Sequence, residues 1–395
     1  MSNTRNSTAM IRMACAIVFI GFVFCYVYYL QTDLLAYAQH VWSGGKTRWN
    51  GMVGAVIITA LLYIIQVLVA SLNTLPQRLY SLSFLPSLMM LAALASISPE
   101  SSLGIVLLTP YSWLACAGVI ISFILILVLK GSRAVERPVV SSSLFSDVSL
   151  VNFALLALMM LCTIGIGNTN RTFHQRLRME RLVYTGEYDK ALEVAKKCDG
   201  NDASMTMLCA YSLMRKGELG ESIFEYPVVA SSEALLPMKK GDGIPSTEQS
   251  RFLFTSNERL WNNIGGMPGE EMTVVDFLNL VQKRGLARRA LPEYVLTAYL
   301  LDCDLKSFAS EISKYYDITK DPLPKHFREA LVLYTHLHSQ RVLTYHSSVL
   351  DADYEDFIKV ERKKYSSIRE KLNVLGNSYL GTYWYYFYKQ RVKND

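Results

Sequence analysis

The first 167 residues of this chain carry very little charge. They contain 8 Lys and Arg and 4 Asp and Glu, whereas the rest of the 395-residue chain contains 32 and 30. A soluble fold needs a charged and polar surface, which this part cannot build. Five apolar runs fill it, at 14–30, 52–72, 79–98, 112–129 and 148–167. A bilayer core takes roughly 20 apolar helical residues, so the sequence predicts a cytoplasmic tail at 1–12 and a membrane domain at 13–167.

The five apolar runs lack Asp, Glu, Lys, Arg and His altogether. Proton relays and ion-coupled carriers place ionisable groups within the membrane, so this absence argues against a proton-coupled transporter. The few polar residues of the runs include Gln66 and Asn152, which we expect to hydrogen-bond to neighbouring helices. Pro86 is expected to kink the third run, because proline removes a backbone donor.

Motifs that carry known chemistry are also absent. The seven cysteines include no C-x-x-C pair, which excludes a zinc ribbon or a thioredoxin-like site. The histidines at 326, 336, 338 and 346 lack the H-E-x-x-H spacing, so we interpret them as solvated or hydrogen-bonded. We predict no catalytic residue, no cofactor and no metal site, and enzymatic activity stays an open question. Cys198 and Cys209 flank a predicted turn, and either a disulfide or two buried thiols fits them.

Basic residues beside the runs predict the orientation. Five crossings place the two termini on opposite sides of the membrane. The flanks on the side of the N-terminus hold six Lys and Arg, whereas the opposite flanks hold Lys46 and Arg48 once the long C-terminal domain is left out. Because Lys and Arg favour the cytoplasmic side, we predict a multi-pass protein of the bacterial inner membrane with a periplasmic C-terminal domain.

Helical periodicity dominates after residue 167, and no stretch alternates in the manner of a strand. The predicted fold class is all-α: about five transmembrane helices followed by a tetratricopeptide-like, α-solenoid soluble domain. Its parts are expected at 168–226 (helical repeats), 227–272 (a loop or linker) and 273–395 (a C-terminal helical domain). Within the last part, 354–372 is predicted as one helix. The near balance of charges after residue 167 gives no electrostatic case for a nucleic-acid partner.

Two segments of the repeat region resemble each other. The pattern Leu-x3-Gly-x-(Tyr or Leu) occurs with Gly186 and Tyr188, and again 31 residues later with Gly217 and Leu219. It is typical of the turn between the two helices of a tetratricopeptide repeat, whose usual period is 34. Glycine ends the first helix in a left-handed cap. The aromatic or Leu residue then packs into the core, and a small residue such as Ala191 lets the helices approach closely.

A third and weaker unit is expected at 291–316, with Asp304 at the glycine position. The alternative for these units is an ordinary helical hairpin. The aromatic segment at 379–388 is followed by basic residues. It either closes the end of a helical core or lies at a membrane interface.

The segment 31–50 joins the first two apolar runs and contains both polar side chains and tryptophans. Its candidate functional residues are Asp33, His40, Lys46 and Arg48. Polar groups beside Trp42 and Trp49 fit either a binding site at the membrane surface or an interfacial helix with aromatic anchors. The sequence leaves both interpretations open.

Three segments carry a resemblance to a known family. They are YAQHVWSGGKT at 37–47, RKGELGESIF at 215–224 and DPLPKHFREAL at 321–331. With them the chain resembles an uncharacterised Bacteroidetes family of multi-pass membrane proteins with a C-terminal helical, repeat-like domain. The resemblance implies a compartment and an architecture, and it implies no activity and no catalytic residue.

Two functions from different classes follow as hypotheses. In the first, the chain is an integral inner-membrane protein that presents a helical-repeat domain to a protein or peptide partner, as a scaffold or adaptor of an envelope process. Stacked helix pairs form grooves suited to that role. In the second, it is a membrane-embedded enzyme or transport component that uses the 31–50 segment and the transmembrane bundle. The lipid bilayer is a partner in both.

Overall fold

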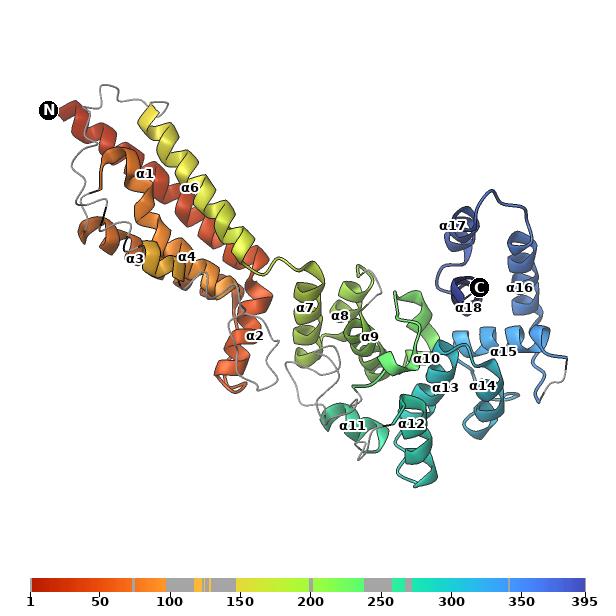
Figure 1. Ribbon diagram of the computed structural model, residues 1–395. Helices are drawn as coiled ribbons and strands as arrows, with labels where there is room; N and C mark the ends of the chain where they lie inside the picture. Colours follow the sequence, from red (N-terminus) through yellow and green to blue (C-terminus); the bar gives the residue numbers. More distant parts are fainter. Residues whose placement is uncertain are drawn as a thin grey trace. The chain divides into compact units, whose positions relative to one another are not determined.

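The computed structural model describes residues 2–72, 75–96, 117–122, 124, 128, 147–198, 202–237, 258–266, 272–339 and 342–394. Within these residues the chain is all-α and contains no strand (Figure 1). It divides into two compact units, Met1–Leu177 and Arg178–Asp395. We call them the membrane unit and the helical unit. The division falls inside α7 (Arg171–Thr185), ten residues after the change in composition at 167/168.

The membrane unit is built from long apolar helices. Its elements are α1 (Ser2–Cys25), the π-helix η1 (Tyr26–Leu30), α2 (Thr32–Trp42), α3 (Gly51–Leu72), the 3-10 helix η2 (Gln77–Phe84), α4 (Leu85–Ala95) and α6 (Asp147–Ile166). Four segments of the described chain are long and apolar enough to cross a membrane: Ala9–Leu30, Gly51–Leu72, Gln77–Ala95 and Asp147–Ile166. They correspond to four of the five predicted runs. The other run, 112–129, lies outside the described residues except for helical residues at 117–122, 124 and 128.

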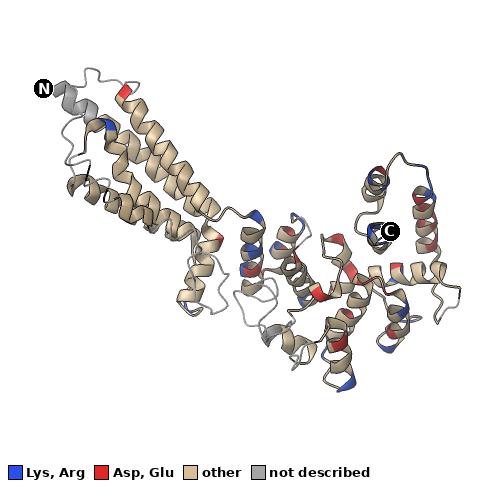
Figure 2. Ribbon diagram, in the orientation of Figure 1, with Lys and Arg blue, Asp and Glu red and all other residues tan. Residues whose placement is uncertain are grey.

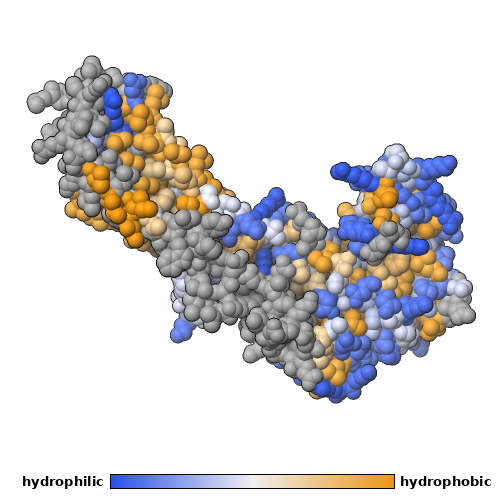
Figure 3. All heavy atoms as spheres, in the orientation of Figure 1, coloured by the Kyte–Doolittle hydropathy of each residue, from blue (hydrophilic) through white to orange (hydrophobic). Residues whose placement is uncertain are grey.

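Helix α3 shows why these helices suit a lipid environment. One face is buried in the unit through Ala55, Thr59, Leu62, Gln66 and Val69. The opposite face is just as apolar but is more than half exposed, at Val53, Ile57, Leu61, Ile64 and Leu68. Figures 2 and 3 show the same surface, with few charges and many apolar atoms on the membrane unit. Exposed apolar side chains at helical spacing are costly in water and favourable in lipid.

The third membrane segment changes from a 3-10 helix to an α-helix just before Pro86, and its non-helical residue is Leu79, seven positions before the predicted kink. Pro86 lies in the first turn of α4, where its missing N–H leaves no helical bond unmade, and the 3-10 helix η2 precedes it. A 3-10 helix rises about 2.0 Å per residue. Together η2 and α4 therefore extend about 32 Å, enough to cross a bilayer core.

Polar side chains from two other helices form hydrogen bonds with backbone and side-chain groups of this segment. Asn152 of α6 accepts a hydrogen bond from the Ser81 backbone N–H at 2.8 Å and donates to the Gln77 carbonyl at 2.9 Å. Gln66 of α3 donates to the Ser83 hydroxyl at 3.0 Å. Irregular backbone is tolerated at membrane depth where the protein itself supplies such partners. The prediction that Gln66 and Asn152 bond across helices is confirmed.

The helical unit consists of shorter helices in close succession. After α7 they are α8 (Tyr188–Ala195), α9 (Ala203–Lys216), α10 (Leu219–Ser222), η4 (Ile223–Glu225), η5 (Ser232–Ala234), α11 (Glu258–Ile264), α12 (Val274–Lys283), α13 (Leu291–Leu301), α14 (Leu305–Glu311), η7 (Ile312–Lys314), α15 (Lys325–Leu337), α16 (Ser348–Glu361), α17 (Ile368–Tyr379) and α18 (Tyr383–Asn394). Most neighbours in sequence pack on each other, and α10 also packs on α13 and α15. One continuous hydrophobic core runs through the unit.

The described part of the segment predicted as a linker, 227–272, takes part in this core. Leu235, Leu236, Trp261 and Ile264 are each buried almost completely. Helix α11 contributes the last two, and the Trp261 ring packs edge-on against Phe277 of α12 at 5.4 Å. The segment as a whole is rich in Ser, Gly and Pro, so its average composition predicts a loop although it contains these four buried apolar residues.

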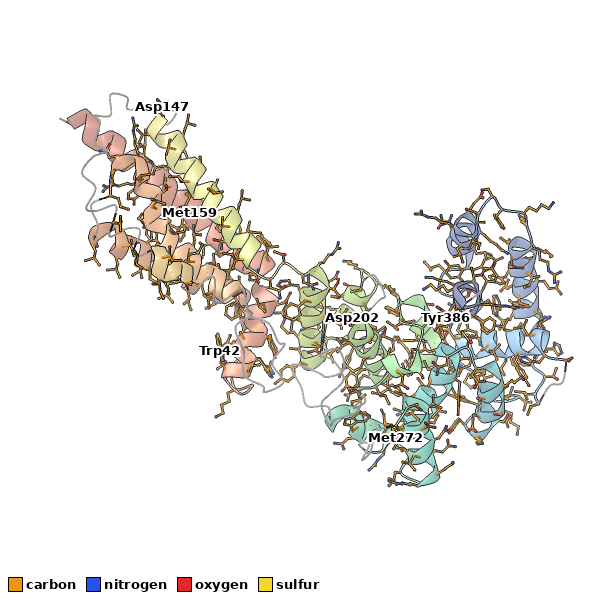
Figure 4. All side chains as sticks on the ribbon, viewed as in Figure 1. Trp42, Asp147, Met159, Asp202, Met272 and Tyr386 are labelled. Carbon is orange, nitrogen blue, oxygen red and sulfur yellow. The ribbon has the colours of Figure 1, made fainter. Side chains whose placement is uncertain are left out.

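The aromatic segment at 379–388 closes the core, which decides between the two predicted alternatives. Tyr383 and Trp384 are buried, and Tyr386, labelled in Figure 4, is 8% exposed. The hydroxyls of Tyr383 and Tyr386 donate to the carbonyls of Leu300 and Leu301 at the end of α13. Aromatic residues bury large areas, and these hydroxyls keep their hydrogen bonds inside the protein.

Candidate functional site

The segment predicted as a loop or interfacial helix at 31–50 is helical over Thr32–Trp42, and Figure 4 labels Trp42 at the end of α2. Asp33 lies in the first turn of α2 and His40 in the last. Seven residues of helix separate them by about 10 Å. Lys46 and Arg48 are exposed in the turn that follows. The structure thus places Asp33 and His40 at opposite ends of a helix and does not join them in one catalytic cluster.

Gln31, which the sequence did not single out, and Trp49 hold this segment by hydrogen bonds. Gln31 is 2% exposed, and its amide donates to the Tyr26 hydroxyl at 3.1 Å and to the Asn168 carbonyl at 3.3 Å. The Trp49 indole donates to the Thr32 hydroxyl at 2.9 Å. A π-helix at 26–30 brings Tyr26 and Gln31 together. Nothing in the sequence marks a π-helix, so periodicity alone does not find this contact.

Three turns of the helical unit share one backbone geometry. A residue with positive φ follows the first helix in each: Gly186 (+82°) and Gly217 (+76°) come directly after it, and Cys303 (+58°) comes two positions after it. The N–H of this residue donates to the carbonyl three residues back, and the next N–H donates to the carbonyl five residues back. This pair of hydrogen bonds is the Schellman motif. The turns join α7 to α8, α9 to α10 and α13 to α14.

The third turn corrects the predicted register by one residue. Cys303, and not Asp304, occupies the left-handed position that glycine holds in the other two turns. Asp304 instead caps α14, because its carboxylate accepts a hydrogen bond from the Ser307 N–H at 3.0 Å. Its predicted place at the glycine position was wrong because an aspartate before a helix satisfies the free N–H groups of that helix.

The other predicted repeat residues lie on the inner side of their units. Ala191 and Leu219 are fully buried, and Tyr188 is partly buried against the core. The three residues occupy the second helices α8 and α10. They pack each second helix against the core, and Tyr188 also lines a groove beside the α7–α8 turn.

A groove lies beside the first of these turns, and we call it the first groove. Its volume is about 480 Å³, and it is lined by Val183, Tyr184, Thr185, Gly186, Tyr188, Tyr211, Arg215, Asn262 and Asn263. These residues come from the α7–α8 turn, α9 and α11. Tyr, Arg and Asn are the side chains that protein-binding surfaces favour, because they combine large contact area with hydrogen bonding.

Ion pairs surround the first groove. Lys216 binds Asp189 at 2.8 Å and Glu218 at 2.9 Å, and Lys190 binds Glu187 at 2.5 Å. The hydrogen bonds with Asp189 and Glu218 raise the pKa of Lys216, and the hydrogen bond from Lys190 lowers the pKa of Glu187. Arg215 extends over the Tyr188 ring, with 5.6 Å between the guanidinium carbon and the ring centroid.

A second groove, of about 570 Å³, lies at the α9–α10 turn. Its lining includes Gly217, Glu218, Glu221, Asp321, Pro322 and Arg328. The two segments quoted above at 215–224 and 321–331 meet here. The Lys325 N–H, at the start of α15, donates to the Glu221 carboxylate at 2.6 Å, and the Lys325 ammonium binds Glu225 at 2.9 Å. These bonds hold the two segments together.

The buried pair His326 and Glu329 of α15 links that helix to α18. His326 Nδ1 lies 3.0 Å from Glu329 Oε2, and both side chains are almost fully buried. The same Glu329 oxygen accepts a hydrogen bond from the Tyr383 N–H at 2.7 Å, and the Glu329 carbonyl accepts one from the Trp384 indole at 2.8 Å. The pair therefore ties α15 to the start of α18.

The other histidines and cysteines considered in the sequence form no metal or disulfide site among the described residues. His336 and His346 each lie 3.4 Å from an oxygen of Asp351. Across the described ranges, no three His, Cys, Asp or Glu side chains are placed to hold a metal ion. Cys198 and Cys209 are both buried thiols and form no disulfide. Burial raises the pKa of the Cys209 thiol, which makes it a poor nucleophile.

Comparison with known proteins gives a family and no activity. No curated protein and no solved structure matches the chain. One family model matches, with the description "Family of unknown function (DUF6057)", over residues 97–256 and 273–390. The match covers more than half of the chain and reaches into α18, and it agrees with the resemblance to an uncharacterised family. The chain therefore belongs to the DUF6057 family.

Proposed function

We propose that this chain is an inner-membrane protein that presents its helical unit to a protein or peptide partner, as a scaffold or adaptor of an envelope process. The observation that carries the proposal is the first groove, with its Tyr188, Tyr211, Arg215 and Asn262 side chains on packed helices. A rigid support lowers the entropy lost when such side chains bind a partner.

The three shared turns support a tetratricopeptide-like organisation of the helical unit. Each turn joins two helices through the same pair of hydrogen bonds. Repeated helix pairs stack side by side, and the surface between them forms an extended binding groove. The first groove is lined by the α7–α8 turn of the first unit, by α9 of the second and by α11.

The location in the bacterial inner membrane and the periplasmic side of the helical unit are part of the proposal. Four apolar helices are long enough to cross a bilayer. The distribution of Lys and Arg along the sequence favours a cytoplasmic N-terminus. With five crossings, the helical unit then meets partners on the periplasmic side.

Site-specific photocrosslinking in cells tests the proposal on the full chain. A benzophenone amino acid replaces Thr185, an exposed residue of the first groove, or Ser310, an exposed residue of α14 outside both grooves. We expect a covalent adduct with a discrete partner from position 185 and none from position 310. The absence of an adduct at position 185, or equal labelling at both positions, contradicts a partner-binding groove.

A further inference from the structure

Charge pairing around the first groove leaves one cation without a partner. Glu187 and Asp189 flank the groove residue Tyr188, Glu218 lies on the α9–α10 turn, and each is bound by Lys190 or Lys216. Arg215 is exposed, and no residue of the described chain forms an ion pair or hydrogen bond with it. It is also the one charged side chain among the described residues that line the groove. The groove thus carries a positive charge that the chain itself leaves unpaired.

The structure holds this guanidinium in a defined place. Arg215 lies in the last turn of α9, and its side chain crosses to the ring of Tyr188 at the start of α8, 5.6 Å away. The Tyr188 ring packs against the core. A guanidinium on an aromatic ring keeps its N–H groups at its edge, where they bind the two oxygens of a carboxylate. Asn262 faces the same groove with an exposed amide.

We infer that the first groove binds an acidic side chain, Asp or Glu, of the partner polypeptide, with Arg215 as the residue that selects it. This inference rests on the proposed function and names the chemistry of the partner. Arginine and carboxylate form two parallel charge-assisted hydrogen bonds, which are stronger than neutral ones. The exposed Asn262 amide supplies a further donor beside them.

Two backbone N–H groups at the α7–α8 turn are not available to a terminal carboxylate. Terminal carboxylates are captured by nests of free backbone N–H groups. The N–H groups of Gly186 and Glu187 are already used, because they donate to the carbonyls of Val183 and Leu182 at 3.1 and 2.8 Å. The donors on which the inference rests are the Arg215 and Asn262 side chains, which both line the groove.

Peptide titration of the full chain in mild detergent tests the inference. The probes are short fluorescein-labelled peptides of alternating Ala and Glu, or Ala and Gln, both with amidated ends. We expect fluorescence anisotropy to show binding of the Glu peptide alone, and Arg215→Gln to weaken it roughly ten- to hundredfold. Arg215→Lys should retain part of the affinity, since it keeps the charge and loses the planar fork. Added salt should weaken the binding.

Arg284→Gln is the matched control, because Arg284 is exposed at the end of α12 and lines neither groove. It should leave the affinity unchanged. Equal binding of the Glu and Gln peptides, an unchanged affinity in Arg215→Gln, or no binding up to about 1 mM overturns the inference. A Gln peptide with a free C-terminal carboxylate that binds as well as the Glu peptide also overturns it.

The crosslinking experiment separates this inference from the proposed function. If the adduct at position 185 forms in the wild-type chain and persists in Arg215→Gln, the groove binds a partner and the acidic anchor is wrong. If the adduct disappears in Arg215→Gln and persists in Arg284→Gln, both statements are supported.

Discussion

At the scale of single residues, three positions with positive φ direct the turns of the helical unit. A side chain in this left-handed region is disfavoured by roughly 1–2 kcal/mol. Gly186 and Gly217 avoid that penalty, and their spacing made the turns predictable from the sequence. Cys303 occupies the same position although it is not glycine, and the sequence pattern placed the turn one residue later, at Asp304. No glycine marks this turn in the sequence, and α13 and α14 pack on each other across it.

Replacing Gly186 by alanine should destabilise the helical unit by roughly 1–2 kcal/mol. No atom lies within 4 Å of the position of the new Cβ, so the loss reports backbone conformation and not a clash. Gly186→Asn is the matched control, and it should cost less because asparagine tolerates the left-handed region. Hydrogen exchange of the α7 and α8 amides in the detergent-solubilised chain measures both. Equal losses would contradict this explanation.

Glu293 is a carboxylate inside the helical unit that its surroundings disfavour. Burial raises its pKa above the ordinary 4.5, although the N–H groups of Gly220 and Leu219 offset part of the effect. A raised folded-state pKa means that the contribution to stability is fully present below pH 4.5. It is lost as the pH rises through the folded-state pKa, because the buried group must then ionise.

Glu293→Gln should therefore gain stability relative to the wild type as the pH rises from about 4 to about 7. The neutral amide keeps the volume of the side chain and has no charge to bury. Thermal unfolding followed by circular dichroism, on the full chain in mild detergent, compares the two proteins at both pH values. A stability difference that is the same at both would show that Glu293 does not titrate in this range.

At the scale of elements, helix ends were harder to predict than helices. The segment 354–372 was predicted as one helix and is two, α16 ending at Glu361 and α17 beginning at Ile368. The Ser367 hydroxyl accepts from the Glu370 N–H, and the Glu370 carboxylate accepts from the Ser366 N–H. This exchange resembles a capping box, which the spacing Ser-x-x-Glu indicates. The Ser-x-x-Glu spacing was not read as a helix start because the charged residues around it fit one continuous helix.

The broken third membrane segment depends on one amide from another element. Asn152→Leu should destabilise the membrane unit by roughly 1–3 kcal/mol, because the Ser81 N–H and the Gln77 carbonyl then lie in an apolar interior without that partner. The thermal unfolding midpoint of the chain in detergent should fall accordingly. Leu158→Ala is the control, since Leu158 is 57% exposed on the same helix and should matter little. Similar falls for both variants would contradict the role of Asn152.

At the scale of the whole molecule, charge distribution is the main guide to the side on which the helical unit lies. With five crossings and a cytoplasmic N-terminus, alkaline phosphatase fused after Asp395 should be active, and a fluorescent protein that matures only in the cytoplasm should be dark. Activity assays and fluorescence on cells expressing each fusion measure this. A bright fluorescent fusion with inactive phosphatase would reverse the proposed orientation, and the partner search would move to the cytoplasm.

The sequence by itself determined the apolar membrane segments, the all-α class and two of the three turns. These depend on local properties: the length of an apolar run, helical periodicity and the conformational freedom of glycine. Only the tertiary structure decided that 379–388 closes the core and that Arg215 is unpaired beside Tyr188. These features depend on contacts between residues far apart in the chain or on different elements, and no local pattern encodes them.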